Sequence, residues 1–190
     1  MGRINLKING YHNIYNVLSA IAVSQTYNIP FNVQKDAIES FFGVKRRNEY
    51  LGKFCGMDIV ADYAHHPKEI EAMLKTFDNQ NKRYMIVFQP HTYSRTRLLM
   101  NDFVSCFNND VPLIIYKTYP ARERYDKKGS AKALHTNLLK INKKSVFYTT
   151  SVTGLENLIK SQENTSDLVL FLGAGDIYNV AKIIAKKQKK

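Results

Sequence analysis

The chain has 190 residues, 44% of them hydrophobic, and a formal net charge of +12. This length and composition allow one sizeable globular domain, or one domain and a piece of another. The sequence holds no apolar run of the roughly 18 to 20 residues that a membrane span needs, which excludes a membrane-spanning protein. The two cysteines, Cys55 and Cys106, have no CxxC spacing and favour neither a metal site nor a disulfide framework, so a reducing cytoplasm is expected.

The positive charge raises the question of a nucleic-acid partner. Lys and Arg are spread through most of the chain, with concentrations at residues 117–132 and 186–190, and no nucleic-acid-binding motif accompanies them. We therefore expect a solvated basic surface, with no nucleic acid and no membrane among the partners.

Residues 1–44 predict a short strand followed by two helices. Residues 4–8 alternate polar and apolar like the end of a strand, and a helix is expected from about His12 to Tyr27. Asn32 is expected to cap a second helix that ends at Gly43. The side chains expected to be buried are Ile14, Val17, Leu18 and Ile21 in the first helix and Ile38, Phe41 and Phe42 in the second. These elements bury too little to form a domain alone, so the segment is interpreted as the end of a larger one.

Residues 45–190 show a different pattern, in which strands and helices alternate. A hairpin is expected between residues 48–54 and 57–62, and further strands at residues 84–88, 111–116, 146–148 and 168–172. Apolar residues recur at helical spacing between and after these strands: Ile70, Met73, Leu74 and Phe77; Leu99, Phe103, Cys106 and Phe107; Leu134, Leu138 and Ile141; Val152, Leu155 and Ile159; Ile177, Val180 and Ile184. The pattern predicts an α/β fold with a mainly parallel, Rossmann-like sheet and helices on both faces.

Polar clusters follow the predicted strands, at residues 62–66, 89–97, 119–122 and 173–176. Because ligands of open α/β sheets bind beyond the carboxyl ends of the strands, a site is expected at this edge. The run Gly173-Ala174-Gly175-Asp176 is compatible with an anion at a helix N-terminus, and equally with a tight turn that has Asp176 near the cap. It lacks the third glycine of a dinucleotide fingerprint, and no GxxxxGK[ST] phosphate loop occurs in the chain.

Two further groups allow alternative interpretations from spacing alone. His12 and Asn16 are four residues apart on one helix face, where they suit the edge of a nucleotide base or a purely structural hydrogen bond. Asn13 is equally compatible with a helix cap. Arg46 and Arg47 follow the second helix, where a guanidinium suits a phosphate or stays in solvent.

Five motifs in order carry a family resemblance. They are Asn9-Gly10-Tyr11-His12-Asn13-Ile14-Tyr15-Asn16, Phe42-Gly43-Val44-Lys45-Arg46-Arg47, Asp62-Tyr63-Ala64-His65-His66-Pro67, Phe88-Gln89-Pro90-His91-Thr92-Tyr93-Ser94-Arg95-Thr96-Arg97 and Gly173-Ala174-Gly175-Asp176-Ile177. Together they closely resemble the carboxy-terminal part of the Mur ligase family, over essentially the whole chain. The FQPHTYSRTR run resembles the branch that joins L-alanine to UDP-N-acetylmuramate rather than the branch that recycles a tripeptide.

The resemblance implies a three-domain enzyme of the bacterial cytoplasm that uses ATP and Mg²⁺ in peptidoglycan synthesis. Residues 1–44 would be the end of a truncated central ATP-binding domain and residues 45–190 the carboxy-terminal domain. The phosphate loop, the metal ligands and the sugar site would lie outside this chain, in the missing amino-terminal and central domains. ATP would phosphorylate the muramoyl carboxylate, and the amine of L-alanine would attack the acyl phosphate.

The resemblance also implies roles for individual residues. His12, Asn13 and Asn16 would lie near adenine, Arg47 near the phosphates and Asp62 near the ribose. Tyr63, His65, Arg95 and Arg97 would frame the alanine and the acyl-phosphate end, with His65, Arg95 and Arg97 as the catalytic residues. A pair of arginines can orient a carboxylate, and positive charge stabilises a developing oxyanion.

Simpler interpretations stay beside these roles. His66 is interpreted as the cap of the helix that begins at Pro67, and His91 as a residue that shapes its loop. The chain itself is interpreted as a ligase fragment that cannot complete its active site. The alternatives are a tripeptide-recycling relative, an autonomous nucleotide- or anion-binding module, and a basic nucleic-acid binder.

Overall fold

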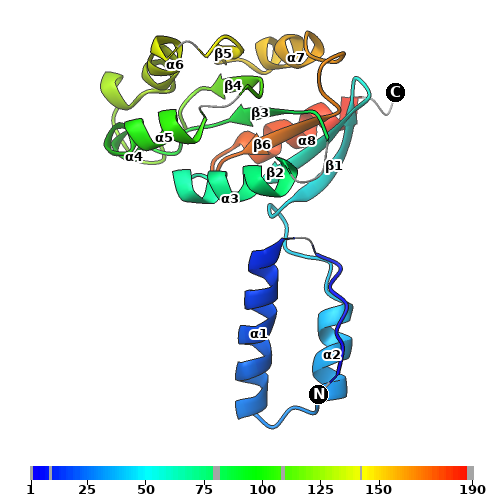
Figure 1. The fold of residues 1–190 in the computed structure, drawn as a ribbon. Helices are drawn as coiled ribbons and strands as arrows, with labels where there is room; N and C mark the ends of the chain where they lie inside the picture. Colours follow the sequence, from blue (N-terminus) through cyan, green and yellow to red (C-terminus); the bar gives the residue numbers. More distant parts are fainter. Residues whose placement is uncertain (1, 9, 79–81, 108–109, 142, 188–190) are drawn as a thin grey trace. The chain divides into compact units, whose positions relative to one another are not determined.

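The computed structural model describes residues 2–8, 10–78, 82–107, 110–141 and 143–187, without the side chains of residues 11 and 12. Residues 188–190 of the predicted basic tail lie outside the described residues. The chain divides into two compact units, Met1–Lys45 and Arg46–Lys190, of which the first is drawn mainly in blue and the second from cyan to red (Figure 1).

The first unit contains the two predicted helices, α1 (Tyr11–Thr26) and α2 (Phe31–Glu39). Pro30 occupies the N-cap of α2, and its carbonyl oxygen accepts the backbone N–H of Gln34 at 3.1 Å. The predicted Asn32 cap is therefore wrong, because Asn32 lies inside the first turn. The helix ends at Glu39 rather than at Gly43, which lies beyond it with a φ of 101°.

The apolar side chains of this unit are less buried than predicted. Ile14 is 44% exposed, Leu18 55% and Phe42 78%. Residues 4–8 adopt no strand, because a backbone without a neighbour has no ladder in which to form hydrogen bonds. The remaining side chains predicted to be buried are partly or largely exposed as well: Val17, Ile21, Ile38 and Phe41. These burial predictions are wrong for the unit taken by itself, which offers its helices too little apolar surface to cover them.

The second unit is built on one six-stranded sheet with the strand order β1-β2-β6-β3-β4-β5. The strands are β1 (Glu49–Phe54), β2 (Met57–Asp62), β3 (Tyr84–Phe88), β4 (Leu113–Tyr116), β5 (Val146–Thr149) and β6 (Leu168–Leu172). β1 runs antiparallel to β2, and the other neighbouring pairs are parallel. The predicted hairpin is confirmed, and its turn places Cys55 and Gly56 at φ values of 49° and 78°, as a type I′ turn requires.

Helices cover both faces of this sheet, as predicted (Figure 1). One face carries α3 (Pro67–Asp78), α5 (Met100–Cys106) and α6 (Ala131–Lys140), and the other carries α7 (Val152–Lys160) and α8 (Ile177–Lys186). Side chains of β3 alternate between the two cores: Ile86 and Phe88 enter one, Met85 and Val87 the other, and all four are 0% exposed. The central strands are thus buried on both faces, which explains their unbroken apolar sequence.

Two helical predictions differ from the structure in detail. The helix expected through residues 99–107 is α5, and a separate short helix, α4 (Tyr93–Leu98), precedes it. The two helices meet at Leu99, which has a φ of −103°. The side chain of Thr92 caps α4, so helical structure begins earlier than the apolar pattern indicated. Ile141 is 40% exposed rather than buried, because α6 ends before it. A 3₁₀ helix, η1 (Lys127–Gly129), precedes α6. Within the described ranges no helix is long and apolar enough to cross a bilayer.

Candidate functional site

Polar side chains from neighbouring strands meet at one edge of the sheet. β6 lies between β2 and β3, and Leu172 pairs with both Asp62 and Phe88. Because the three strands are parallel, the residues that follow each of them leave the sheet at the same carboxyl edge. The sequence motifs after β2, β3 and β6 therefore converge, as expected from their places in the chain.

Asp62 ends β2 and is only 5% exposed. Its two carboxylate oxygens accept the backbone N–H groups of Asn48 and Ala64, each at 2.8 Å. Burial raises the pKa of Asp62 above its ordinary value, against the opposing effect of these two donors and of the Arg47 guanidinium. Arg47 also lies over the ring of Tyr63, with 5.6 Å between Cζ and the ring centroid. The structure thus brings the predicted residues Arg47, Asp62 and Tyr63 together.

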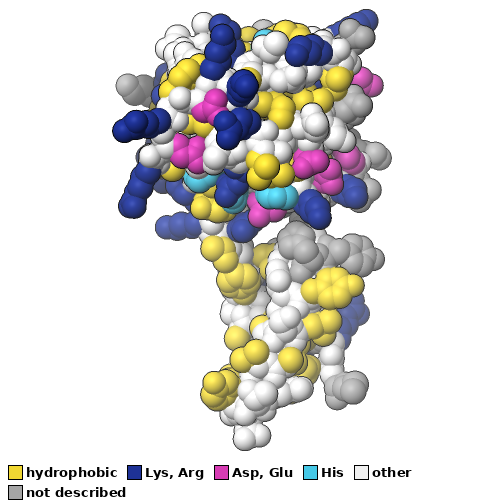
Figure 2. Space-filling view, turned by 90° about the vertical axis from the view of Figure 1, so that its left-hand side faces the viewer, with side chains coloured by type: hydrophobic (Ala, Val, Ile, Leu, Met, Phe, Trp, Pro, Cys, Tyr) yellow, Lys and Arg dark blue, Asp and Glu magenta, His cyan; other side chains and the backbone are white. Residues whose placement is uncertain are grey.

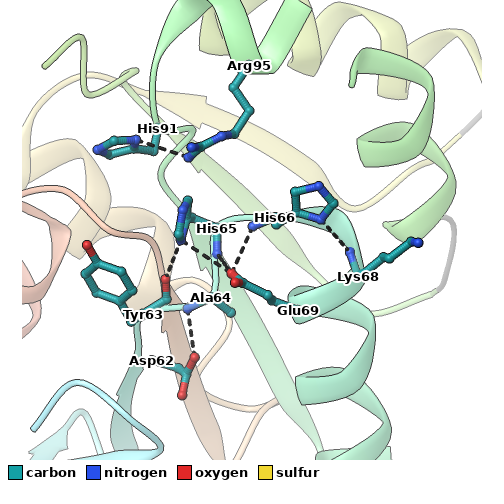
Figure 3. Close-up of polar contacts among 9 residues, drawn as sticks. All are labelled: Asp62, Tyr63, Ala64, His65, His66, Lys68, Glu69, His91 and Arg95. Carbon is teal, nitrogen blue, oxygen red and sulfur yellow. Dashed lines mark hydrogen bonds and ion pairs between the residues drawn. The ribbon is translucent and has the colours of Figure 1, made fainter. Parts of the chain in front are cut away.

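His65 is held through its Nδ1 atom. This atom lies 3.0 Å from the carbonyl oxygen of Tyr63 and 3.4 Å from Oε2 of Glu69 (Figure 3). The same carboxylate oxygen accepts the backbone N–H groups of His65 at 3.0 Å and of His66 at 3.2 Å. The His65 side chain is 18% exposed, so its ring is largely enclosed by these neighbours.

Glu69 is a site residue that the sequence motifs did not identify. Burial alone raises the pKa of Glu69, but the N–H donors of His65 and His66 and the nearby positive charges outweigh it, and the pKa lies below its ordinary value. The signal was present in the sequence, because an acid in the first turn of a helix accepts N–H groups from the residues before that helix. His66 caps the helix as interpreted, since its Nδ1 accepts the N–H of Lys68 at 3.3 Å.

His91 faces His65 from the end of β3. The two ring centroids are 5.5 Å apart, and His91 also stacks on Tyr119 at 5.4 Å with an interplanar angle of 19°. Arg95 places Nη1 3.3 Å from Nδ1 of His91. Burial lowers the pKa of His91, and the charges of Arg95 and His65 lower it further against the pull of Glu123.

Hydrogen bonds hold the backbone beside His91 in an unusual conformation. Thr92 has a φ of 63°, which is uncommon for a β-branched residue. Its N–H donates to the carbonyl oxygen of Tyr119 at 3.1 Å, and the N–H of Tyr119 donates to Pro90 at 2.9 Å. His91 therefore does shape its loop through the bridge to Tyr119, while its ring lies among the site residues.

Arg95 and Arg97 reach different partners. Arg97 places Nη1 3.1 Å from Oδ2 of Asp126, and its side chain is 60% exposed. Residues two apart on a helix do not share a face, which accounts for the divergence. Arg95 belongs to the cluster around His91, whereas Arg97 ties α4 to the loop before η1.

Gln89 explains the arrangement of the Gly173–Asp176 turn. It is 0% exposed; its Oε1 accepts the N–H of Ile177 at 3.1 Å, and its Nε2 donates to Oδ1 of Asp176 at 2.6 Å. A Cβ at Gly175 would lie 2.5 Å from Oε1 of Gln89 and 2.5 Å from Cγ of Tyr119. The first N–H of α8 is thus engaged by protein, which favours the tight-turn interpretation over the anion site.

The predicted adenine residues lie in the other unit, on the first turns of α1. Nδ2 of Asn16 donates to Oδ1 of Asn13 at 3.2 Å. Gly10 is the N-cap of α1, so Asn13 is not the cap. The side chain of His12 lies outside the described residues.

The family resemblance implies a metal ion and a nucleotide, and the described residues do not suit both of these equally well. Among them, no three or more His, Cys, Asp or Glu side chains are grouped to hold a metal ion. Asp62 fits a sugar hydroxyl, because each carboxylate oxygen that accepts one N–H retains a lone pair for a second donor.

The second unit is thus a mainly parallel α/β domain that carries histidines, an arginine and a tyrosine at the carboxyl edge of its strands. The family model described as "Mur ligase, glutamate ligase domain" matches residues 46–175. The chain belongs to the Mur ligase family.

Among its relatives, the UDP-N-acetylmuramate–L-alanine ligase of Caldanaerobacter subterraneus subsp. tengcongensis is 39% identical over 100% of this chain. The ligase of the same name from Clostridium beijerinckii is 39% identical over 94% of it. The chain spans 41% of the first relative and 39% of the second.

Solved structures agree with this membership. The UDP-N-acetylmuramate-alanine ligase MurC of Thermotoga maritima has a TM-score of 0.75 at 26% identity, covering 100% of this chain and 40% of that one. A folylpolyglutamate synthase of Mycobacterium tuberculosis shares the fold alone, with a TM-score of 0.72 at 12% identity over 94% of this chain and 40% of that one.

Proposed function

We propose that this chain is the carboxy-terminal part of an ATP-dependent ligase that joins L-alanine to UDP-N-acetylmuramate through an acyl-phosphate intermediate in the bacterial cytoplasm. The observation that carries the proposal is the convergence of Tyr63, His65 and Arg95 at one sheet edge, in a chain whose full length aligns with relatives of that name. The Tyr63 and His65 rings are in edge contact, with centroids 5.3 Å apart.

The chemistry of this cluster suits an amino-acid nucleophile. Arg95 has N–H donors beyond the one directed at His91, and a guanidinium can hold a carboxylate in a fixed orientation. An α-amino group is mainly an ammonium ion at neutral pH and must lose a proton before it attacks. An imidazole beside the bound carboxylate is suited to accept that proton.

The remaining roles follow the family resemblance and are part of the same proposal. Arg47 and Asp62 contact the phosphates and ribose of ATP, and His12, Asn13 and Asn16 contact its adenine. Arg97 pairs with Asp126 and supports the loop before η1 rather than contacting the amino acid. ATP supplies the phosphoryl group that activates the muramoyl carboxylate, and Mg²⁺ is bound by residues outside this chain.

The proposal is tested with the complete protein from which this chain derives. Phosphate release is measured with ATP, Mg²⁺, UDP-N-acetylmuramate and L-alanine, and then with each component omitted. We expect release that requires both UDP-N-acetylmuramate and L-alanine. D-Alanine serves as the matched control, because it carries the same charges with the opposite stereochemistry.

The same assay addresses the alternative of a tripeptide-recycling ligase. Release that requires a tripeptide and ignores L-alanine would replace the proposed activity with that one. No release with either acceptor, from a protein that binds ATP, would support an anion- or nucleotide-binding module instead.

A further inference from the structure

Two imidazoles at the sheet edge differ in the atoms that contact their Nδ1 nitrogens. His65 Nδ1 lies 3.0 Å from the carbonyl oxygen of Tyr63 and 3.4 Å from Oε2 of Glu69. A carbonyl or carboxylate oxygen only accepts, so Nδ1 of His65 must carry the hydrogen. In the neutral ring the lone pair is then on Nε2.

His91 has the opposite arrangement. Its Nδ1 lies 3.3 Å from Nη1 of Arg95, and a guanidinium only donates. Nδ1 of His91 must therefore hold the lone pair, and its hydrogen is on Nε2. The direction of the His91 pKa, lowered by burial and then by the charge of Arg95, agrees with a neutral ring.

The two rings face the same space. Their centroids are 5.5 Å apart, and the edge of the His65 ring opposite Nδ1 points toward His91 and the guanidinium of Arg95 (Figure 3). The ionisable groups that surround the pair are Tyr63 and Glu69 around His65, and Arg95, Tyr119 and Glu123 around His91.

We propose that the Tyr63 carbonyl oxygen together with Glu69 on one ring, and Arg95 on the other, hold His65 and His91 in opposite tautomers, so that the site offers one imidazole acceptor and one neutral imidazole donor. The inference deepens the proposed ligase and rests on it for the identity of the nucleophile. Glu69 is a positioning residue: its Oε2 accepts two backbone N–H groups and faces Nδ1 of His65, so it fixes the loop and reinforces the tautomer that the Tyr63 carbonyl oxygen sets.

The tautomers assign a path for the proton. Nε2 of His65 takes one proton from the alanine ammonium, and the amine lone pair forms the C–N bond to the acyl carbon. The electron pair of the carbonyl π bond moves to oxygen, and its return expels phosphate with the C–O bonding pair. The second amine proton leaves with phosphate, which balances the step. Nε2–H of His91 is the neutral donor for an oxygen in this space.

The tautomers are measured directly by ¹⁵N NMR of histidine-labelled 190-residue chain at neutral pH. Protonated and unprotonated ring nitrogens resonate in separate regions, and the chain has five histidines, so single substitutions assign each ring. We expect Nδ1–H and bare Nε2 in His65, and the reverse in His91. The opposite tautomer in either ring would overturn the proposal. This measurement needs no substrate, so its result is independent of the proposed ligase activity.

Kinetics of the complete protein test the role of Glu69. Glu69→Ala removes the acceptor of the His65 and His66 N–H groups, so it is expected to loosen the loop and to lower kcat roughly 10- to 100-fold, while the KM for alanine changes less than about threefold. The Tyr63 carbonyl oxygen remains beside Nδ1, so the Nδ1–H signal of His65 should weaken without being lost. Glu69→Gln keeps an acceptor for the backbone N–H groups and should restore part of kcat. The matched control is Glu71→Gln on the exposed side of the same helix, which should leave tautomers and kcat unchanged.

The results that would refute the positioning role differ from those that would refute the proposed ligase activity. An unchanged kcat in Glu69→Ala would refute the positioning role, even with the expected tautomers in the unmodified chain. If Glu69→Ala does not fold, Glu69→Gln and the unmodified chain still decide the question through the NMR signals. A complete protein that does not use L-alanine would instead contradict the proposed function and leave the tautomers as measured.

Discussion

Replacing each of two arginines on the same short helix by lysine tests the amino-acid site. Arg95 directs Nη1 to His91 within the cluster, whereas Arg97 pairs with Asp126 and is 60% exposed. Both substitutions keep the positive charge and remove the planar fork. The two variants thus differ mainly in whether the altered side chain reaches the site.

The expected magnitude follows from the number of donors. The ammonium group introduced by Arg95→Lys cannot hold His91 and both oxygens of a carboxylate in the geometry of a guanidinium, so about one charge-assisted hydrogen bond is lost. Such a bond contributes roughly 1.5 to 3 kcal/mol, which raises the KM for alanine about 10- to 100-fold. Arg97→Lys weakens an exposed ion pair worth at most about 1 kcal/mol of folding stability, and the KM should change less than about threefold.

The assay is steady-state phosphate release by the complete protein, with alanine and ATP varied in turn. The KM for ATP should stay within about threefold of its value in the unmodified protein in both variants. Losing a contact to one substrate raises the KM for that substrate and not for the other. An equal rise in alanine KM for both variants would show that Arg97 also reaches the substrate and that the paired-arginine interpretation holds. Unchanged alanine kinetics in Arg95→Lys would refute the assignment of this site.

Three further outcomes are expected. Gln89→Leu strands the N–H of Ile177 and the carbonyl of Lys117, so the unit Arg46–Lys190 should lose about 3 kcal/mol in denaturant unfolding; a loss below about 1 kcal/mol would contradict this. The lowered pKa of His91 means that the unfolded chain binds the extra proton between that pKa and 6.5, so the free energy of unfolding should rise as pH rises through this window, and His91→Gln should remove that part of the slope. The 190-residue chain should bind ATP with Mg²⁺ only at Kd values of about a millimolar or more in calorimetric titration, because its sequence has no phosphate loop, and micromolar saturable binding would favour an autonomous module.

The distribution of charge on the surface also bears on how the chain interacts. On the face shown, Lys and Arg side chains lie mainly on the larger unit, with Asp, Glu and His side chains between them (Figure 2). On this face the positive charge does not form the one continuous band that a nucleic-acid partner favours.

The sheet was predictable because its strands satisfy one local rule. Central strands such as β3 and β6 are buried on both faces, so their apolar runs stand out from the flanking turns. The hairpin was predictable for a similar reason, since Gly56 supplies a left-handed residue between two strand-like runs. The strand order was harder to predict from the sequence. β6 pairs with both β2 and β3, and more than a hundred residues of chain separate β2 from β6.

The first unit was predicted less well because several side chains that its helical spacing marks as buried are exposed in the structure. Ile14 and Leu18 recur at helical spacing, yet both are more than 40% exposed and line an open apolar groove. Periodicity reports which side of a helix prefers to be covered and does not identify the cover. The break at Leu99 was missed for a related reason, since the apolar spacing continues through it while the cap at Thr92 starts a separate helix.

At the candidate site the sequence indicated the right residue types and left their division of labour open. Asp62 and Gln89 are 5% and 0% exposed, and their polar atoms are engaged mainly by backbone groups beside the strand ends, with the Asp176 side chain as a further partner of Gln89. His65 uses only Nδ1 in this way and turns its opposite edge toward His91 (Figure 3). A polar residue that is fully engaged by buried backbone mainly affects folding when it is replaced, whereas one with a free edge in the site affects kinetic constants. Replacing Gln89 should therefore change mainly the free energy of unfolding, and replacing His65 should change mainly the kinetic constants, although both residues belong to motifs of similar appearance. Burial and the partner of each atom decide whether a side chain supports the site or acts in it, and membership of a motif does not.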